Sequence, residues 1–191
     1  MTASINAPIY IGISFFAPEI ISILLGPGWE QSSGLLRILA LWGGLRSTGN
    51  PVGSLLLGMG RANLSLKWNL ALLFIIPPAI FLGAQLGVNG LVWTMFGIMA
   101  ACFIPLYLIL VYPLCHARLM EYLVSLLKPF IISVLAILPA YCFSVQFNDA
   151  LIRLILGFSI SAPLYLAFCY KFNHEWFRAM LQLTGLMKIR D

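Results

Sequence analysis

Residues 35–69, LLRILALWGGLRSTGNPVGSLLLGMGRANLSLKWN, decide the predicted fold because they combine a long apolar run with two arginines. We predict that residues 32–60 form one membrane-spanning helix, since about 20 predominantly apolar residues are enough to cross a bilayer core. Arg46 lies at the centre of this span and Arg37 lies near its start. An unpaired arginine at mid-bilayer costs between about 2.5 and 17 kcal/mol. We therefore expect Arg46 to face neighbouring helices or a water-filled cavity.

A helical wheel divides this span into one small, polar face and one leucine-rich face. Arg46, Asn50 and Gly53 fall within a narrow arc of the polar face. Ser54 and Gly58 extend that face and form a pair of small residues four positions apart, which lets another helix approach closely. We expect lipid to contact the opposite face, which carries Leu41, Leu45, Val52, Leu55, Leu56 and Met59.

The dipeptide Asn50–Pro51 predicts a kink just past the middle of the span. Proline lacks a backbone N–H, and its ring clashes with the preceding turn of a helix. Gly53 follows two residues later, so we expect Pro51 and Gly53 together to permit bending.

The composition of the chain excludes an ordinary soluble domain. Of its 191 residues, 61% are hydrophobic and 9% are charged, whereas charged residues make up about a quarter of a soluble domain. The formal net charge is +5, but the basic residues are scattered at the ends of apolar runs, which argues against a nucleic-acid partner. We predict an all-α, polytopic transmembrane helical bundle.

The apolar runs predict about six membrane spans, at residues 8–25, 32–60, 64–86, 91–112, 129–147 and 151–170. Residues 1–170 would then form a six-span transmembrane bundle. We expect residues 171–191 to form a cytoplasmic amphipathic tail on the inner leaflet, because apolar side chains recur in it every three or four positions. The alternative is that this tail packs on the bundle.

Lysine and arginine mark the cytoplasmic ends of membrane helices. The segments after the second, fourth and sixth predicted spans hold Arg61, Lys67, Arg118, Lys128, Lys171, Arg178, Lys188 and Arg190. The turns after the first, third and fifth spans hold only Arg153. We therefore predict that both termini are cytoplasmic and that Arg61 and Lys67 anchor the inner end of the second and third spans.

No residue pattern predicts an enzyme, a metal site or a cofactor site. His116 and His174 have no cysteine or carboxylate at ligand spacing, and the four cysteines show no metal-ligand spacing. Functional chemistry is therefore expected from the charges within the predicted spans.

Three charged residues lie within the first two predicted spans. Glu19 and Arg37 have similar predicted depth on adjacent spans, which predicts an ion pair; the alternative is that each side chain snorkels separately. Arg46 has no acid at matching depth. Its partner could be an anionic ligand, a group on helices outside this chain, or Asn50 together with backbone carbonyls. Arginine suits phosphate because its planar fork binds two oxygens at once.

Two segments resemble the polysaccharide exporters of the MOP flippase superfamily, nearest to the colanic-acid and lipopolysaccharide branch. The first is residues 20–30, IISILLGPGWE, an apolar segment that ends in a glycine and an interfacial tryptophan. The second is residues 45–69, in which the similar positions are Arg46, Gly49, Asn50, Pro51, Gly53, Ser54, Gly60, Arg61, Lys67, Trp68 and Asn69.

The resemblance implies a flippase with two helical lobes around a central cavity that moves lipid-linked oligosaccharide outward across the bacterial inner membrane by alternating access. It implies that this chain is most of the second lobe of a MOP/MATE-like transporter, and that the amino-terminal lobe is missing. Undecaprenyl-pyrophosphate-linked oligosaccharide would be the substrate, and membrane lipids would surround the helices. Arg46 and Arg37 would be cavity cations that attract the pyrophosphate.

Two alternatives remain open at this point. One is a multidrug or cation antiporter of the same superfamily, which needs a membrane-embedded acid, and only Glu19 could serve. The other is a membrane scaffold that transports nothing.

Overall fold

The computed structural model describes residues 2–115, 118–173, 176–177 and 180. Within these residues the chain is helical and contains no strand, so the all-α prediction is confirmed. The helices in chain order are α1 Thr2–Phe15, α2 Ala17–Leu24, α3 Ser32–Gly58, α4 Ala62–Gln85, α5 Gly87–Ala101, α6 Phe103–Leu106, η1 Tyr107–Val111, α7 Tyr112–Cys115, α8 Leu119–Ser144 and α9 Ala150–Phe172.

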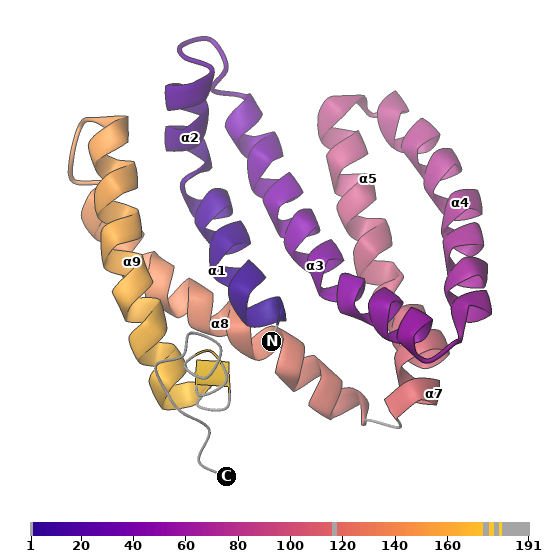
Figure 1. The fold of residues 1–191 in the computed structure, drawn as a ribbon. Helices are drawn as coiled ribbons and strands as arrows, with labels where there is room; N and C mark the ends of the chain where they lie inside the picture. Colours follow the sequence, from indigo (N-terminus) through magenta and orange to yellow (C-terminus); the bar gives the residue numbers. More distant parts are fainter. Residues whose placement is uncertain (1, 116–117, 174–175, 178–179, 181–191) are drawn as a thin grey trace.

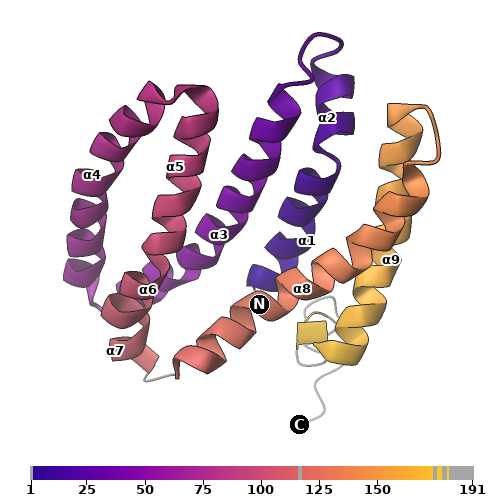
Figure 2. The same ribbon diagram turned by 180° about the vertical axis from the view of Figure 1, so that it is seen from behind.

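The long helices stand side by side in a row (Figures 1 and 2). The α4–α5 hairpin lies at one end of the row and the α8–α9 hairpin at the other, with α1, α2 and α3 between them. α1 packs against α3 and α8, and α3 packs against α5. α4 buries little of its surface within the chain, so the α4 end of the row is open.

The buried core lies where α1, α8 and α9 meet. One cluster joins α8 to α9 and consists of Ile132, Ala136, Tyr165 and Cys169. A second cluster joins α1 to α8 and consists of Ile11, Phe16 and Ile137. These apolar contacts hold α1, α8 and α9 together. α3 packs on α1 on one side and on α5 on the other, so it joins this core to the open α4–α5 side.

The first predicted span consists of two helices instead of one. α1 and α2 are separated by Phe16, and their axes differ by 71°. Pro18 explains the break, because proline donates no backbone hydrogen bond and its ring clashes with the carbonyl four residues earlier. Phe16 is fully buried, and its ring occupies the space that a Cβ on Gly157 of α9 would need.

Four segments are long and apolar enough to cross a membrane, namely α4, α5 through η1, α8 and α9. The bent α1–α2 pair would make a fifth. α3 is not among them, although its 27 residues exceed the length required. Its two arginines and its small polar residues lower its hydropathy. The prediction of a multi-pass membrane protein is therefore confirmed, whereas the count of six spans is not.

α3 ends at a glycine turn that reverses the chain into α4. Gly60 has φ +70°, which glycine adopts without strain. Its N–H donates to the Leu57 carbonyl (3.1 Å), and the Arg61 N–H donates to the Leu56 carbonyl (2.9 Å), which is the Schellman pattern of a helix end.

Two proline-containing segments depart from the predicted boundaries. The fourth span changes helical geometry after Pro105, because η1 is a short π-helical segment. α8 begins at Leu119, well before the predicted start of the fifth span, and continues through Pro129. The Ser133 hydroxyl donates to the Pro129 carbonyl (2.8 Å). This is the bond to the carbonyl four residues earlier that a serine side chain commonly makes inside a helix.

The described part of the tail packs on the bundle. Trp176 contacts the α8–α9 core, with its ring centroid 6.3 Å from that of Tyr165. The Asn173 amide donates to the Ser4 hydroxyl (3.1 Å). These contacts agree with the alternative interpretation of the tail, but residues 174–175, 178–179 and 181–191 lie outside the described residues, so the boundary at residue 171 stays a prediction.

Candidate functional site

A groove of about 460 Å³ opens between α3, α4 and α5. Its walls are mostly apolar, and its polar side chains are Arg46 from α3 and Ser65 and Asn69 from α4. Arg46 is the one charged residue among the described residues that line it. Ligand sites in proteins usually measure about 300–1,000 Å³, so this groove is large enough to hold a headgroup.

The Arg46 side chain is exposed and lies over the ring of Trp42, with its guanidinium carbon 5.2 Å from the ring centroid. Trp42 is one helical turn earlier on α3, the spacing at which helical side chains meet. Among the described groups, Arg46 has no carboxylate partner and makes no hydrogen bond, including to a backbone carbonyl. This cation–π contact needs no hydrogen-bond acceptor, and the N–H donors of Arg46 have no partner among the described groups.

Two glycines of α3 keep the groove open beside Arg46. A Cβ on Gly53 would meet no atom within 4 Å, and a Cβ on Gly49 would meet only Leu106 Cδ1, at 3.7 Å. The helical wheel places Gly53 in the same arc as Arg46, and both residues line the groove. The predicted bending at Gly53 stays a prediction.

α3 continues as one helix through Asn50 and Pro51. Figure 1 shows its C-terminal part curving toward the turn into α4. The side chains of Asn50 and Pro51 lie outside the described part of the chain. The hydrogen-bonding role of Asn50 and the hinge role of Pro51 therefore stay predictions.

The close helix contacts of α3 are made by other small residues than the predicted pair. Ser54 and Gly58 are exposed, and a Cβ on Gly58 would meet no described atom within 4 Å. By contrast, a Cβ on Gly43 would lie 2.7 Å from Tyr10 Cε1, and one on Gly44 would lie 3.1 Å from Phe130 Cε1. Gly43 and Gly44 thus let α1 and α8 approach α3, while the packing role of Ser54 and Gly58 stays a prediction.

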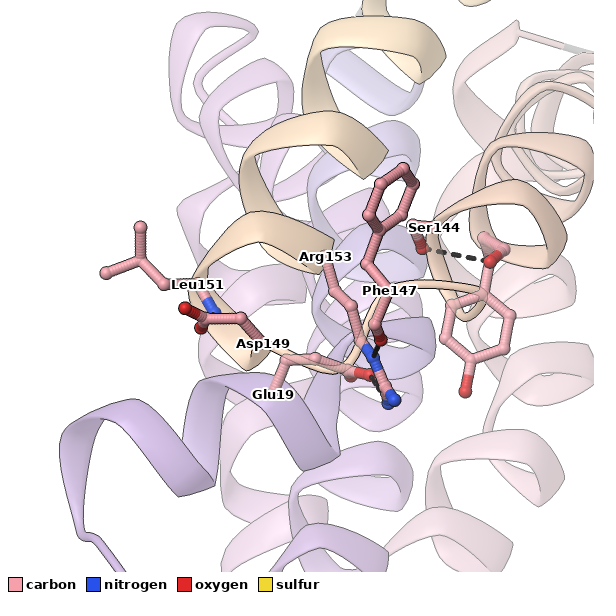
Figure 3. A network of polar contacts seen from close by, with 7 residues as sticks. Glu19, Ser144, Phe147, Asp149, Leu151 and Arg153 are labelled. Carbon is pink, nitrogen blue, oxygen red and sulfur yellow. Dashed lines mark hydrogen bonds and ion pairs between the residues drawn. The ribbon is translucent and has the colours of Figure 1, made fainter.

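Glu19 is 3% exposed and forms an ion pair with Arg153, with 3.5 Å between Oε1 and Nη1 (Figure 3). Arg153 Nε also donates to the Phe147 carbonyl (2.5 Å). Asp149 caps α9 by accepting from the Leu151 N–H (2.9 Å). Glu19 Oε2 has no hydrogen-bond partner among the described residues. The pair therefore fastens α2 to the beginning of α9.

The predicted Glu19–Arg37 ion pair is wrong. Arg37 is exposed on α3, does not line the groove of Arg46, and has no carboxylate partner among the described residues. The depth argument assumed that the first span is straight. The 71° bend after α1 brings Glu19 to the side of α2 that meets α9, where Arg153 reaches it.

The two basic residues predicted at the inner end are both exposed. Arg61 Nη1 donates to the Pro113 carbonyl (3.3 Å), which links the α3–α4 turn to α7. Lys67 lies in the second turn of α4 with no partner among the described residues. Neither residue lines the groove.

Sequence reasoning gave no site role to four residues of these two sites: Trp42, Trp68 and Asn69 in the groove, and Arg153 as the partner of Glu19. Trp68 and Asn69 stood only among the positions that carry the resemblance. The four-residue spacing of Trp42 and Arg46 could have indicated their contact. Trp68 and Asn69 belong to the next helix, so only the geometry of the turn brings them opposite Arg46.

The chain is similar to three curated proteins. It is 28% identical to the lipopolysaccharide biosynthesis protein WzxC of Escherichia coli (strain K12) over 148 residues, 77% of this chain and 30% of that protein. It is 28% identical to the teichuronic acid biosynthesis protein TuaB of Bacillus subtilis (strain 168) over 173 residues, 90% of this chain and 35% of that protein. An uncharacterized membrane protein in the cps region of Klebsiella pneumoniae is 24% identical over 161 residues, 80% of this chain and 33% of that protein.

The chain thus spans about a third of the length of the curated relatives that it matches. No protein-family model matches it. No solved structure matches it either.

Proposed function

Since this chain resembles the polysaccharide exporters of the MOP superfamily, with WzxC and TuaB among its relatives, we propose that it is part of a flippase for lipid-linked polysaccharide or O-antigen repeat units. The substrate is an undecaprenyl-pyrophosphate-linked oligosaccharide, which moves from the inner to the outer leaflet of the bacterial inner membrane. Residues 1–170 supply the second lobe of the transporter and act with an amino-terminal lobe. Both termini are cytoplasmic, and residues 171–191 lie at the inner leaflet.

The observation that carries this proposal concerns Arg46, which has no ion-pair partner among the described residues and is the one charge among those that line the groove. In this proposal α3 crosses the membrane, where an arginine is costly unless a partner or water compensates it. Here the helix offers only the ring of Trp42, and the N–H donors stay free among the described groups. A pyrophosphate presents oxygens in the pairs that a guanidinium fork binds best.

The antiporter alternative has less support. The acid that it needs, Glu19, is buried against Arg153 and lies outside the groove of Arg46. Its ion pair with Arg153 joins α2 to α9, which favours a structural role for this carboxylate.

The test is a binding measurement on the purified full chain in lipid nanodiscs. We expect undecaprenyl pyrophosphate to bind more tightly than uncharged undecaprenol. Arg46→Ala should weaken pyrophosphate binding by about tenfold to a hundredfold, the equivalent of one or two charge-assisted hydrogen bonds. The affinity of Arg46→Lys for undecaprenyl pyrophosphate should lie between that of the wild type and that of Arg46→Ala, because lysine offers a point charge instead of a fork.

Arg37→Ala is the matched control, because it removes a second arginine of α3 that lies outside the groove. Its affinity for undecaprenyl pyrophosphate should equal that of the wild type. Unchanged binding in Arg46→Ala, or an equal loss in both variants, contradicts the assignment of Arg46 to the substrate.

A further inference from the structure

Two tryptophans line the same groove from opposite helices. Trp42 lies on α3 and Trp68 on α4, and both side chains are partly buried. Trp42 already stacks on the guanidinium of Arg46. By contrast, no described charged group contacts the indole of Trp68.

Trp68 makes no polar contact and no ring pair with the described residues. It belongs to neither buried cluster, pairs with no aromatic ring, and its indole N–H donates to no described group. Buried tryptophans normally find a partner for that N–H. A partly buried indole that lines a groove with its N–H free is available to a ligand.

The polar neighbours of Trp68 indicate what kind of ligand fits. The Asn69 amide donates to the Ser65 carbonyl (2.9 Å), and its Oδ1 atom accepts from no described group. Both residues line the groove beside Trp68. An aromatic face next to a free amide oxygen suits a ring that has C–H groups on its face and hydroxyl groups at its edge, which is a pyranose sugar.

We propose that Trp68 contacts the first sugar of the substrate. With the pyrophosphate on Arg46, the sugar ring attached to it lies against the Trp68 indole, and Asn69 Oδ1 accepts a hydrogen bond from a sugar hydroxyl. This step rests on the proposed function, because Arg46 must first hold the pyrophosphate. It adds that the groove recognises the first sugar as well as the negative charge of the pyrophosphate.

The test compares two probes on the full chain in nanodiscs: undecaprenyl pyrophosphate, and undecaprenyl pyrophosphate that carries one glucose. The wild type should bind the glucosylated lipid about fivefold more tightly, in line with one aromatic stacking contact. Trp68→Leu should remove this difference and leave the affinity for the bare lipid unchanged. Trp68→Phe should keep part of it, since the smaller ring still stacks.

Trp93→Leu is the matched control, because Trp93 is an exposed tryptophan of α5 that lies outside the groove. It should keep the full glucose-dependent gain. Retention of the gain in Trp68→Leu overturns the proposal, as does an equal loss of affinity for both lipids, which indicates that Trp68 only anchors α4 at the membrane interface.

The two proposals fail in different ways. A wild-type chain that binds both lipids equally overturns the sugar contact and leaves the pyrophosphate site intact. A wild-type chain that binds neither lipid, or Arg46→Ala binding as well as wild type, overturns the proposed function and the sugar contact with it.

Discussion

The two deeply placed charges, Glu19 and Arg46, are accommodated in opposite ways. Glu19 is removed from solvent and held by Arg153. Arg46 is exposed to a groove, and within the described part of the chain its guanidinium is held by an aromatic ring alone. A buried ion pair mainly joins elements, because both charges are satisfied within the protein. An exposed cation with free donors is the group that a ligand can reach, so we assign structure to Glu19 and binding to Arg46.

We predict that Arg153→Met destabilises the protein by about 1–3 kcal/mol, because it removes the one partner that the buried Glu19 carboxylate has among the described residues. Thermal unfolding in detergent measures the loss. Arg37→Met is the control and should leave the unfolding temperature unchanged, since Arg37 pairs with no described carboxylate. Replacing both members, as Glu19→Leu with Arg153→Met, should recover much of the stability. An equal loss in the Arg37 and Arg153 variants contradicts the observed pairing.

The sequence predicted that Glu19 needs a cation but not which one. Depth along straight helices pointed to Arg37, and the break at Phe16 changed the direction in which Glu19 points. The break itself has a sequence signal in Pro18. Arg153 could not have been chosen, because the contact between α2 and α9 joins elements far apart in the chain.

At the scale of the element, α3 performs two tasks along its length. Its first half carries Gly43 and Gly44, which let α1 and α8 pack closely. Its second half carries Arg46 and Gly53, which line the groove. Arg46 and Gly53, which share one arc of the helical wheel, both line the groove, but so do Val52 and Leu56, which were expected to face lipid. Leu56 is 1% exposed. A wheel assumes one buried face, whereas α3 is covered by different neighbours on different sides.

Replacing Gly53 with a large residue tests whether a ligand enters the groove. Gly53→Leu should fold normally, because the added side chain enters open space and leucine favours the helix. That side chain fills the groove beside Arg46, so binding of undecaprenyl pyrophosphate in nanodiscs should fall by at least about tenfold. Circular dichroism should confirm unchanged helix content.

Gly58→Leu is the matched control for this variant. It adds the same side chain to the same helix, also into open space, but outside the groove. Its binding should equal that of the wild type. The same affinity in both variants would mean that the ligand does not enter the groove.

At the scale of the whole molecule, the sequence predicted the membrane class well and the arrangement of helices poorly. Hydropathy and helix length are local properties, so the all-α, multi-pass fold could be derived from them. The groove depends on how the α4–α5 hairpin leans against α3, which no local pattern encodes. The hairpin itself relies on close contacts such as Gly83 against Thr94.

The connections fall into two groups, one at the upper ends and one at the lower ends of the long helices as Figure 1 shows them. The α2–α3, α4–α5 and α8–α9 connections lie at one end, while the α3–α4 turn, the start of α8 and the end of α9 lie at the other (Figures 1 and 2). The second group is the one that carries most of the lysines and arginines. The positions of the basic residues and the positions of the connections therefore group the helix ends in the same way. Because basic helix ends face the cytoplasm, we predict that the second group is cytoplasmic.

Cysteine labelling tests this orientation. In a cysteine-free background, Gln31→Cys and Gln146→Cys lie in exposed turns at one end, and Asn63→Cys lies at the other, just inside α4. A membrane-impermeant maleimide added to intact spheroplasts should label the first two and spare the third, because the basic ends remain inside. After lysis all three should react. Labelling of Asn63→Cys alone would mean that the orientation is the reverse of the predicted one, with the basic ends outside. The arrangement of the helices in a row would not be affected. Labelling of Gln31→Cys and Asn63→Cys together in intact spheroplasts would mean that α3 does not cross the bilayer, and Arg46 would then lie too shallow to act on a headgroup in transit.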